Sequence, residues 1–356
     1  MSFRAILIPG GAGFVGANLA IMLKAQLESV EITAFDNLKR RGSEQNLPRL
    51  REAGVAFVHG DIRNRDDFDG LAAFDLLIDC SAEASVQAGL DGAPDYLLQT
   101  NLVGTLNLLE LARRSDAAFL FLSTSRVYPI ETLSNAPYQE EVSRLAWQTD
   151  IDIPGLSAAG VSERFSLEGA RSLYGASKLA GELILAEYSN SYGMPALINR
   201  CGVIAGPWQM GKQDQGVVAL WVARHEFERS LRYIGYGGTG KQVRDVLHVR
   251  DLADLVMRQM KDLSHWDARP FNVGGGRAVS FSLLELTALC QATTGKEVPI
   301  GSVPETSPVD IPIYLTDNTR VSQAFDWSPT TKVEAIVADV QAWLSQHRSV
   351  LAGLIP

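Results

Sequence analysis

The first 200 residues alternate between two patterns of apolar and polar positions. Short runs of aliphatic and β-branched residues are followed by longer stretches with helical spacing. The short runs predict strands at residues 5–8, 30–35, 56–59, 76–79, 119–123 and 196–200. The helical spacing predicts helices over residues 14–26, 96–114 and 177–192. Because the predicted strands are almost wholly apolar, their order indicates an α/β fold with a doubly wound parallel sheet covered by helices on both faces.

The pattern changes after Gly206-Pro207, where it becomes mixed and residues 235–240 are rich in glycine. Further helices are predicted over residues 249–263, 282–294 and 333–347. We therefore expect a first domain over residues 1–206 and a smaller mixed α/β lobe over residues 207–356, interleaved with the last strands of the sheet. Residues 129–171 form an insertion in the first domain. Loops of this length are usually functional, and we interpret it as a lid over a site.

Composition and charge exclude several classes of function. The 356 residues carry a net charge of −9, which argues against nucleic acid as a partner. No apolar run approaches the ~20 residues of a membrane span. The N-terminus lacks a basic segment and a cleavage site, so we expect no signal peptide and a cytoplasmic location. The three cysteines, Cys80, Cys201 and Cys290, show no metal-like spacing, and we expect free thiols and no metal.

A glycine-rich segment lies where the first predicted strand turns into a helix. Gly10, Gly13 and Gly16 are spaced three apart, which allows a backbone to approach a pyrophosphate at a helix N-terminus. Asp36 follows twenty residues after Gly16, at the end of the second strand, where a carboxylate binds the adenine ribose. The first domain is therefore predicted to be a Rossmann-type NAD-binding domain.

Basic residues close to Asp36 leave a second cofactor open. Lys39, Arg40 and Arg41 can accept the 2′-phosphate of NADP, whereas the Asp36 carboxylate repels it. Asp61 and Ile62 follow the third strand, in a position to meet the adenine edge. A polar cap of that strand explains Asp61 equally well. The sequence favours NAD.

Tyr174 and Lys178 lie four residues apart, on one face of a predicted helix. A free tyrosine has a pKa of about 10, so it is a poor base at neutral pH. A neighbouring ammonium lowers that pKa and makes the tyrosine a usable base. The hydroxyl side chains of the stretch Ser123-Thr124-Ser125 follow an apolar strand, which places them at the carboxyl edge of the sheet, where α/β folds bind ligands. A hydroxyl from this stretch, together with Tyr174 and Lys178, predicts hydride chemistry at a nicotinamide.

With these motifs the chain resembles the extended short-chain dehydrogenase/reductases that act on nucleotide sugars, over nearly its whole length. In that family the catalytic Ser or Thr lies four residues before the Val-Tyr tyrosine, here Tyr128, which marks Thr124. The resemblance implies that Thr124, Tyr174 and Lys178 are catalytic. It implies that the cofactor is held by Gly10, Gly13, Phe14, Val15, Gly16, Asp36, Asn37, Arg40, Asp61, Ile62, Cys80, Ser81, Ala82, Asn101, Tyr174, Lys178 and Cys201.

The second half is similar to the CDP-tyvelose (CDP-paratose) 2-epimerases. The strings that carry this similarity begin at Asp214 (Asp-Gln-Gly-Val), Gly240 (Gly-Lys-Gln-Val-Arg-Asp-Val-Leu-His), Phe271 (Phe-Asn-Val-Gly-Gly) and Asp326 (Asp-Trp-Ser-Pro). The resemblance implies that Arg244 binds the substrate diphosphate, a task that suits a guanidinium fork. A salt bridge to Asp245 or Asp251 is the alternative for Arg244. The substrate-binding residues expected from these positions are Glu83, Arg126, Gln209, Gln215, Gln242 and Arg244.

The expected activity is NAD-dependent inversion of carbon 2 of a CDP-linked sugar through a transient keto intermediate. Tyr174 would take the proton from the sugar hydroxyl while a hydride passes from the same carbon to NAD. Epimerisation at carbon 4 and simple dehydrogenase or reductase activity stay open, and a non-catalytic dinucleotide sensor is a remote alternative. In the related 4,6-dehydratases the threonine is followed by Asp-Glu. Here Ser125-Arg126 stands in those places, which argues against elimination.

Two departures put the identity of the sugar in doubt. The segment after the fourth strand reads Asp79-Cys-Ser-Ala-Glu83, where the family commonly has a histidine before small residues, and Arg200-Cys-Gly-Val203 lacks a substrate-binding Asn.

The long predicted helices 96–114 and 177–192 correspond to a dimeric helix bundle in relatives. A homodimer or homotetramer is therefore expected.

Overall fold

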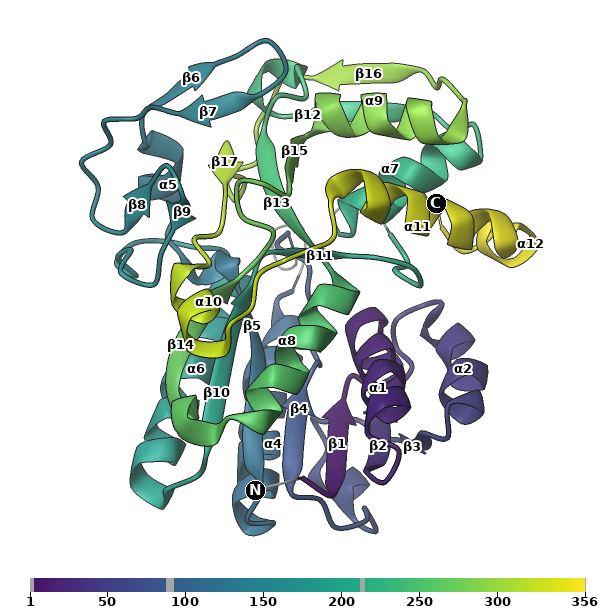
Figure 1. Cartoon of the computed structure of the whole chain (residues 1–356), viewed down its shortest axis with the longest axis vertical. Helices are drawn as coiled ribbons and strands as arrows, with labels where there is room; N and C mark the ends of the chain where they lie inside the picture. Colours follow the sequence, from purple (N-terminus) through teal and green to yellow (C-terminus); the bar gives the residue numbers. More distant parts are fainter. Residues whose placement is uncertain (1–2, 88–92, 212–214, 356) are drawn as a thin grey trace.

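The computed structural model describes residues 3–87, 93–211 and 215–355; Asp214 lies outside them. Its centre is one seven-stranded parallel sheet with the strand order β14-β10-β5-β4-β1-β2-β3 (Figure 1). The strands are β1 (Ala5–Pro9), β2 (Glu31–Asp36), β3 (Ala56–His59), β4 (Leu76–Asp79), β5 (Ala118–Thr124), β10 (Ala196–Cys201) and β14 (Asp267–Val273). The doubly wound α/β sheet is confirmed. Strand order reverses between β1 and β4, which creates a crevice at their carboxyl ends.

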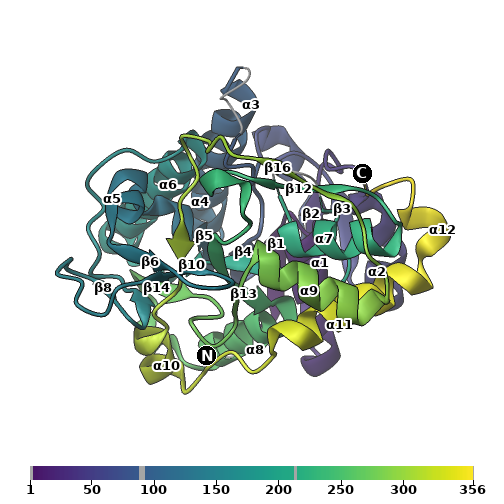
Figure 2. The same cartoon turned by 90° about the horizontal axis from the view of Figure 1, so that it is seen from above.

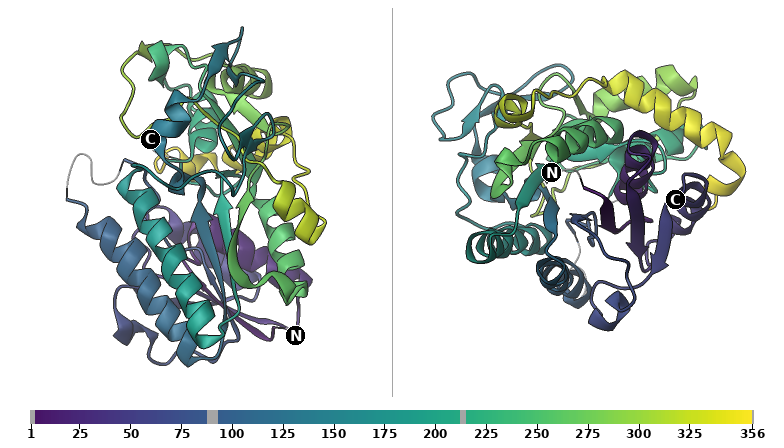
Figure 3. Two further views of the ribbon diagram at one scale, coloured as in Figure 1. Left: turned by 90° about the vertical axis from the view of Figure 1, so that its left-hand side faces the viewer. Right: turned by 60° about the horizontal axis from the view of Figure 1, so that its bottom comes forward.

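Alternate residues of β1 feed two different hydrophobic cores. Ile6 and Ile8 pack with α1 (Phe14–Gln26) and α8 (Val249–Lys261) on one face of the sheet. Leu7 packs with α4 (Thr105–Arg114) and α6 (Leu173–Tyr192) on the other face. Figure 3 shows α4 and α6 running side by side along that face. Both faces are buried, which explains why the strands are continuously apolar rather than alternating.

The helix predicted over residues 96–114 is interrupted by an irregular turn. It begins as α3 (Asp95–Leu98), passes through a π-helical turn, η3 (Gln99–Gly104), and continues as α4. The π-helical turn carries the buried Asn101. Turns of this kind insert one extra residue into a helix and are frequent at functional sites.

A second, smaller set of elements stands above the carboxyl edge of the sheet. β11 (Val203–Ala205), β13 (Val243–His248), β15 (Ser280–Ser282) and β17 (Ile313–Tyr314) form a mixed sheet, and β12 (Leu231–Ile234) pairs with β16 (Ile300–Val303). α7 (Val217–Glu226), α9 (Leu283–Thr294) and α11 (Val333–Gln346) pack together on one side (Figure 2). β14 and α8 also come from the second half of the chain. β14 nevertheless pairs with β10 in the seven-stranded sheet, and α8 packs against that sheet. The remaining helical segments are η1 (Ser43–Gln45), α2 (Asn46–Glu52), η2 (Arg65–Phe68), η4 (Ser125–Val127), η5 (Tyr236–Gly238), η6 (Leu263–His265), α10 (Thr319–Phe325) and α12 (Arg348–Leu351).

The insertion over residues 129–171 contains short elements of its own. They are α5 (Ile130–Asn135), the hairpin of β6 (Tyr138–Glu140) with β7 (Leu145–Trp147), and the hairpin of β8 (Leu156–Ser157) with β9 (Gly160–Val161). Arg144 forms a salt bridge of 2.5 Å with Glu285 at the start of α9. The Val161 amide donates to the Leu315 carbonyl at 2.8 Å. The insertion is therefore docked on the second set of elements, and its function as a lid stays a prediction.

Candidate active site

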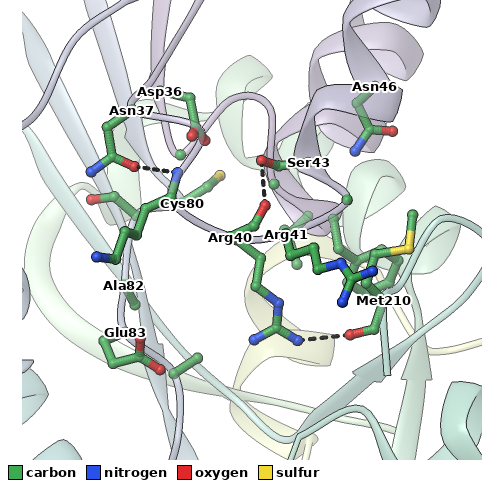
Figure 4. A pocket seen from close by; sticks show the side chains of 18 of the residues that line it. Asp36, Asn37, Arg40, Arg41, Ser43, Asn46, Cys80, Ala82, Glu83 and Met210 are labelled. Atoms are coloured by element: carbon green, nitrogen blue, oxygen red, sulfur yellow. Dashed lines mark hydrogen bonds between the residues drawn. The ribbon is translucent and has the colours of Figure 1, made fainter. Parts of the chain in front are cut away.

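A cavity of about 540 Å³ opens at the carboxyl ends of β1, β2 and β4 (Figure 4). It gathers most of the predicted cofactor residues and three predicted substrate residues that lie far apart in the sequence. Those that line it are Gly10, Gly13, Phe14, Val15, Asp36, Asn37, Arg40, Ile62, Cys80, Ser81, Ala82, Glu83, Gln209 and Gln215. Three other lining residues, Tyr96, Met210 and Leu354, were not predicted from the sequence, because no motif marks them.

The glycine loop is packed too tightly for any side chain. Gly10 has a φ of +72°, and a Cβ there would lie 2.6 Å from the Cys80 carbonyl oxygen. A Cβ on Gly16 would lie 2.2 Å from the Gly10 carbonyl oxygen. Helix α1 begins after Gly13 without a side-chain cap and without an acidic residue in its first turn, among the described residues. Its amides are thus available to an anion, which fits the pyrophosphate of NAD.

Asp36 ends β2 at the edge of this cavity. Its carboxylate accepts hydrogen bonds from the amides of Ala12, at 3.1 Å, and Leu38, at 2.8 Å. Burial raises the pKa of the Asp36 carboxyl, although both amides oppose that rise. A carboxylate fixed by the glycine loop is placed to accept from ribose hydroxyls, as the sequence predicts.

Two of the basic residues that left NADP open are engaged elsewhere. The Arg40 guanidinium donates to the Met210 carbonyl at 2.7 Å and also contacts Gln215, which bridges the cavity from β2 to the second set of elements (Figure 4). Arg41 donates to the Gly353 carbonyl at 2.9 Å. Lys39 stands over the Tyr96 ring at 5.1 Å. These contacts engage the guanidinium groups of Arg40 and Arg41 with backbone carbonyls, which favours NAD over NADP.

The Asp61 side chain has partners of its own. It accepts from Asn37 at 2.9 Å and forms a salt bridge of 2.6 Å with Arg63, which holds the pKa of the Asp61 carboxyl well below its usual range. It does not belong to the residues that line the cavity, whereas Ile62 does. An adenine contact through Ile62 stays a prediction. The contacts of Asp61 fit the alternative interpretation of this residue, a polar cap of the third strand, better than an adenine contact.

Tyr174 is placed by the packing of α6 against the end of β5. Ser172 caps the helix by accepting from the Gly175 amide at 3.2 Å. A Cβ on Gly175 would lie 2.1 Å from the Arg126 carbonyl oxygen, so only glycine allows the helix start to come this close. The close approach brings the Tyr174 hydroxyl into hydrogen-bonding contact with Thr124. The sequence-predicted pair of hydroxyls is therefore brought together.

Burial dominates the titration of Tyr174. It raises the pKa of the phenol to about 12, although the Thr124 hydrogen bond opposes the rise. The sequence predicted a pKa lowered by Lys178, and that prediction is wrong for this structure. The reason is desolvation, which penalises the tyrosinate more than nearby groups stabilise it.

Lys178 is buried and lies among other charged groups. Its Nζ stands 3.9 Å from the centre of the Phe121 ring. Burial lowers the pKa of the ammonium, and the carboxylates of Asp79 and Glu182 oppose that change. Asp79 is a residue to which the sequence reasoning gave no role. It ends β4, is fully buried, and has one carboxylate oxygen on Ser81 and one without a partner among the described residues.

Glu182, one turn after Lys178, leads into a buried polar network. It forms a salt bridge of 2.7 Å with Arg200, which donates to the Tyr128 hydroxyl at 3.2 Å. Tyr128 in turn donates to Asn272 at 2.7 Å, and the Asn272 amide side chain donates to the Val161 carbonyl of the insertion at 2.9 Å. The network links α6, β10, β14 and the insertion. It gives Arg200 and Asn272 structural partners.

Two arginines outside the cavity lining meet at one carboxylate, and one of them, Arg126, lies close to Tyr174. Arg244 forms a salt bridge of 2.6 Å with Asp310, and Arg126 reaches the same carboxylate at 3.9 Å. The alternative partners of Arg244, Asp245 and Asp251, are therefore replaced by a residue that no motif marks. Burial and the charge of Arg244 lower the pKa of Arg126 to about 10.

The other predicted residues have these positions. Asn101 donates to the Glu83 carbonyl at 3.0 Å and to Ser177 at 3.2 Å, so it ties the cavity wall to α6. Cys201 is buried at the end of β10, opposite Thr124 in the strand register. Gln242 is buried and donates to the Ile234 carbonyl at 2.9 Å. The Gln209 side chain donates to the Ile204 carbonyl at 3.0 Å.

Within residues 3–87, 93–211 and 215–355, no cluster of three or more His, Cys, Asp or Glu side chains is arranged to bind a metal ion. In the same residues, every helix is too short or too polar to cross a bilayer.

A dinucleotide loop at the switch point of the sheet, followed by a Thr–Tyr pair with a buried lysine, defines a nicotinamide-dependent enzyme of the short-chain dehydrogenase/reductase class. Residues 6–274 match the NAD dependent epimerase/dehydratase family. The chain belongs to this family, and its cofactor is NAD.

Known proteins and a solved structure are similar to this chain over nearly its full length. CDP-paratose 2-epimerase of Salmonella typhi is 31% identical and covers 96% of this chain and 99% of its own length. UDP-glucose 4-epimerase GEPI42 of Cyamopsis tetragonoloba is 25% identical, with 97% and 96% covered. The solved structure of Pal from Bacillus thuringiensis has a TM-score of 0.78 at 26% identity, with 96% and 99% covered.

Proposed function

We propose that this protein is an NAD-dependent nucleotide-sugar epimerase that inverts carbon 2 of a CDP-linked sugar. The observation that carries the proposal is the contact between Thr124 and Tyr174, with Arg126 close by and Arg244 next to Arg126. It places an acid–base group next to a pair of cations that suits a diphosphate. The similarity to a CDP-paratose 2-epimerase over nearly the whole chain supports the carbon and the nucleotide.

The residues that would hold NAD are the glycine loop, Asp36 and the segment Cys80–Ala82. Bound there, NAD would supply the acceptor for the hydride of the sugar carbon and the donor that returns it. Tyr174 removes the proton of the sugar hydroxyl and gives it back after the keto sugar has presented its other face. Thr124 donates a hydrogen bond to the same oxygen and stabilises its developing charge.

Lys178 keeps a positive charge beside the nicotinamide position. Its ammonium stabilises the tyrosinate, an effect that has to overcome the burial of Tyr174. The carboxylates of Asp79 and Glu182 help Lys178 to stay protonated in its buried position. The three residues thus work together on one proton.

Inversion at carbon 4, or a dehydrogenase or reductase activity, uses the same residues and is the second candidate. Its support is the full-length similarity to a UDP-glucose 4-epimerase. A 4,6-dehydratase of Streptomyces griseus is also similar, at 26% identity. Elimination of water nevertheless needs an acid and a base, and Ser125 and Arg126 supply neither at neutral pH.

Proton NMR of CDP-, UDP- and dTDP-sugars in deuterated water tests both the carbon and the nucleotide. We expect a CDP-sugar to be inverted at carbon 2 with its carbon-bound hydrogen retained. Inversion at carbon 4 would favour the second candidate. Deuterium at the inverted carbon would exclude a hydride route.

Replacing Tyr174 with Phe tests the assignment of the base. We expect the Tyr174→Phe variant to lose at least about 10³-fold in turnover, since it removes the phenol that contacts Thr124. NAD released on denaturation, measured by chromatography, should be unchanged. Retained turnover in a correctly folded variant would exclude Tyr174 as the base.

The assembly that we propose is a homodimer or homotetramer built through α4 and α6. On α6 the side chains of Leu173, Leu183 and Tyr192 are exposed, at 40%, 62% and 59%. Helix α6, which carries them, lies in the outer helix layer beside the sheet (Figure 3). A second copy of the chain is the partner that would cover them.

A further inference from the structure

The carboxylate of Asp310 stands where the diphosphate of the proposed substrate would bind. It lies 2.6 Å from the Arg244 guanidinium and 3.9 Å from that of Arg126. Each of the three side chains is mostly buried, with 29%, 14% and 22% of its surface exposed. In these surroundings a charge is screened far less than at the surface.

Asp310 is held there by the chain on either side of it. The Ile311 amide donates to its carboxylate at 2.9 Å, and the Ile311 carbonyl accepts from Arg244 at 2.6 Å. A few residues earlier, Thr306 accepts from the Tyr236 amide at 2.8 Å, which fixes this segment to η5. The Val309 carbonyl accepts from Arg126 at 3.4 Å. The carboxylate is therefore built into the arginine pair.

The charges do not cancel. Arg126 and Arg244 supply two positive charges, and Asp310 supplies one negative charge to both. A diphosphate that reaches the arginines would meet the Asp310 carboxylate at short range, where two like charges in a partly buried site repel each other.

We propose that Asp310 is an internal counter-ion of the substrate site, which keeps the two arginines together without substrate and weakens the binding of the nucleotide diphosphate. This inference rests on the proposed function, because it takes Arg126 and Arg244 as the diphosphate-binding residues. It makes Asp310 a residue that sets specificity for phosphate charge. The arginine pair would then hold product less tightly than two uncompensated guanidinium groups would.

Calorimetric titration of the NAD-loaded protein with cytidine, CMP and CDP, and in parallel with UDP and dTDP, tests the proposal. Asp310→Asn keeps the shape of the side chain and removes its charge. We expect CDP to bind this variant about tenfold more tightly, CMP to gain less, and cytidine to be unchanged. The gain for CDP should shrink as salt is added. Glu305→Gln removes a charge from an exposed residue of the same segment and should change none of these values.

Unchanged or weaker CDP binding by Asp310→Asn would overturn the inference. Asp310→Ser is the second variant, in case the uncompensated arginines prevent Asp310→Asn from folding, and the same gain is expected of it. Arg244→Gln separates the proposed diphosphate site from the proposed role of Asp310. If the arginines bind the diphosphate, this variant should bind CDP at least about tenfold less tightly. If Arg244→Gln binds cytidine, CMP and CDP as tightly as the wild type does, the proposed diphosphate site itself is wrong. If only the Asp310 variants behave like the wild type, the counter-ion inference alone is wrong.

Discussion

The reactivity of Tyr174 is decided by what surrounds its hydroxyl. Burial raises its pKa to about 12, and Thr124 is the first group that opposes this rise. A tyrosine in such a position is a base only when other charges, from Lys178 and the bound cofactor, stabilise its anion. The single hydroxyl of Thr124 therefore affects the pH dependence of the whole reaction.

Replacing Thr124 with Val should shift the pH–rate profile to higher pH. The hydrogen bond stabilises the tyrosinate, so its loss raises the pKa of Tyr174, and we expect a shift of about one unit. Turnover near pH 7 should fall about tenfold for this reason and further because the reacting oxygen loses a donor. Thr33→Val, on β2, is the matched control and should leave the profile in place. An unshifted profile in Thr124→Val would contradict this role.

At the scale of elements, the junction of β1 with α1 determines whether NAD can bind. Gly16 lies in the first turn of α1, where a Cβ would be 2.2 Å from the Gly10 carbonyl oxygen. The glycines are needed here for close packing of the helix onto its own loop, in addition to their approach to the ligand.

Gly16→Ala should therefore displace the loop. We expect the free energy of unfolding to fall by about 1–3 kcal/mol, as for other overpacked sites, and the bound NAD to be lost. Urea unfolding and the NAD content of the purified protein measure the two effects. Gly301→Ala, on β16, meets no atom closer than 3.5 Å and is the control. Full NAD content in Gly16→Ala would disprove the packing argument.

At the scale of the whole molecule, Asp245 joins the two sets of elements. It lies on β13, is fully buried, and accepts from the amides of Gly276, at 2.9 Å, and Thr316, at 3.1 Å. Burial raises the pKa of its carboxyl from 3.8 to about 6. The folded chain thus binds the proton more tightly than the unfolded chain does.

This difference makes the stability depend on pH with a definite sign. The contribution of Asp245 is fully present below about pH 4 and is lost as the pH rises through about 6. Asp245→Asn cannot ionise and keeps an oxygen for the two amides. We expect it to match the wild type near pH 4 and to be more stable by up to about 3 kcal/mol above pH 7. Urea unfolding across this range tests the prediction. Parallel curves of unfolding free energy against pH for the wild type and Asp245→Asn would contradict it.

The proposed assembly is also a property of the whole molecule. Leu183→Glu places a charge on the outer face of α6, at the most exposed of its three exposed apolar side chains. We expect this variant to sediment as a smaller species than the wild type. Val142→Glu changes an equally apolar side chain, 94% exposed near the tip of the β6–β7 hairpin, and should leave the mass unchanged. A wild-type mass for Leu183→Glu would exclude this face.

The sequence by itself determined the sheet and the cofactor loop, and it predicted the acid–base residues. These features are local, because apolar runs set the strands, a three-residue glycine spacing sets the turn, and a four-residue spacing sets the helix face that carries Tyr174 and Lys178. The family resemblance added Thr124 and Arg244.

Only the tertiary structure decided which groups surround those residues. Asp79, at the end of β4, and Asp310, far along the chain, act on Lys178 and Arg244 through space, and no spacing in the sequence marks either one. The pKa of Tyr174 is likewise a result of burial, which depends on the packing of α6 against β5. The Gly10–Gly16 loop, the Tyr174–Lys178 pair and Thr124 thus follow from sequence and family. Their electrostatics follow from long-range contacts, because charge and desolvation act across the fold.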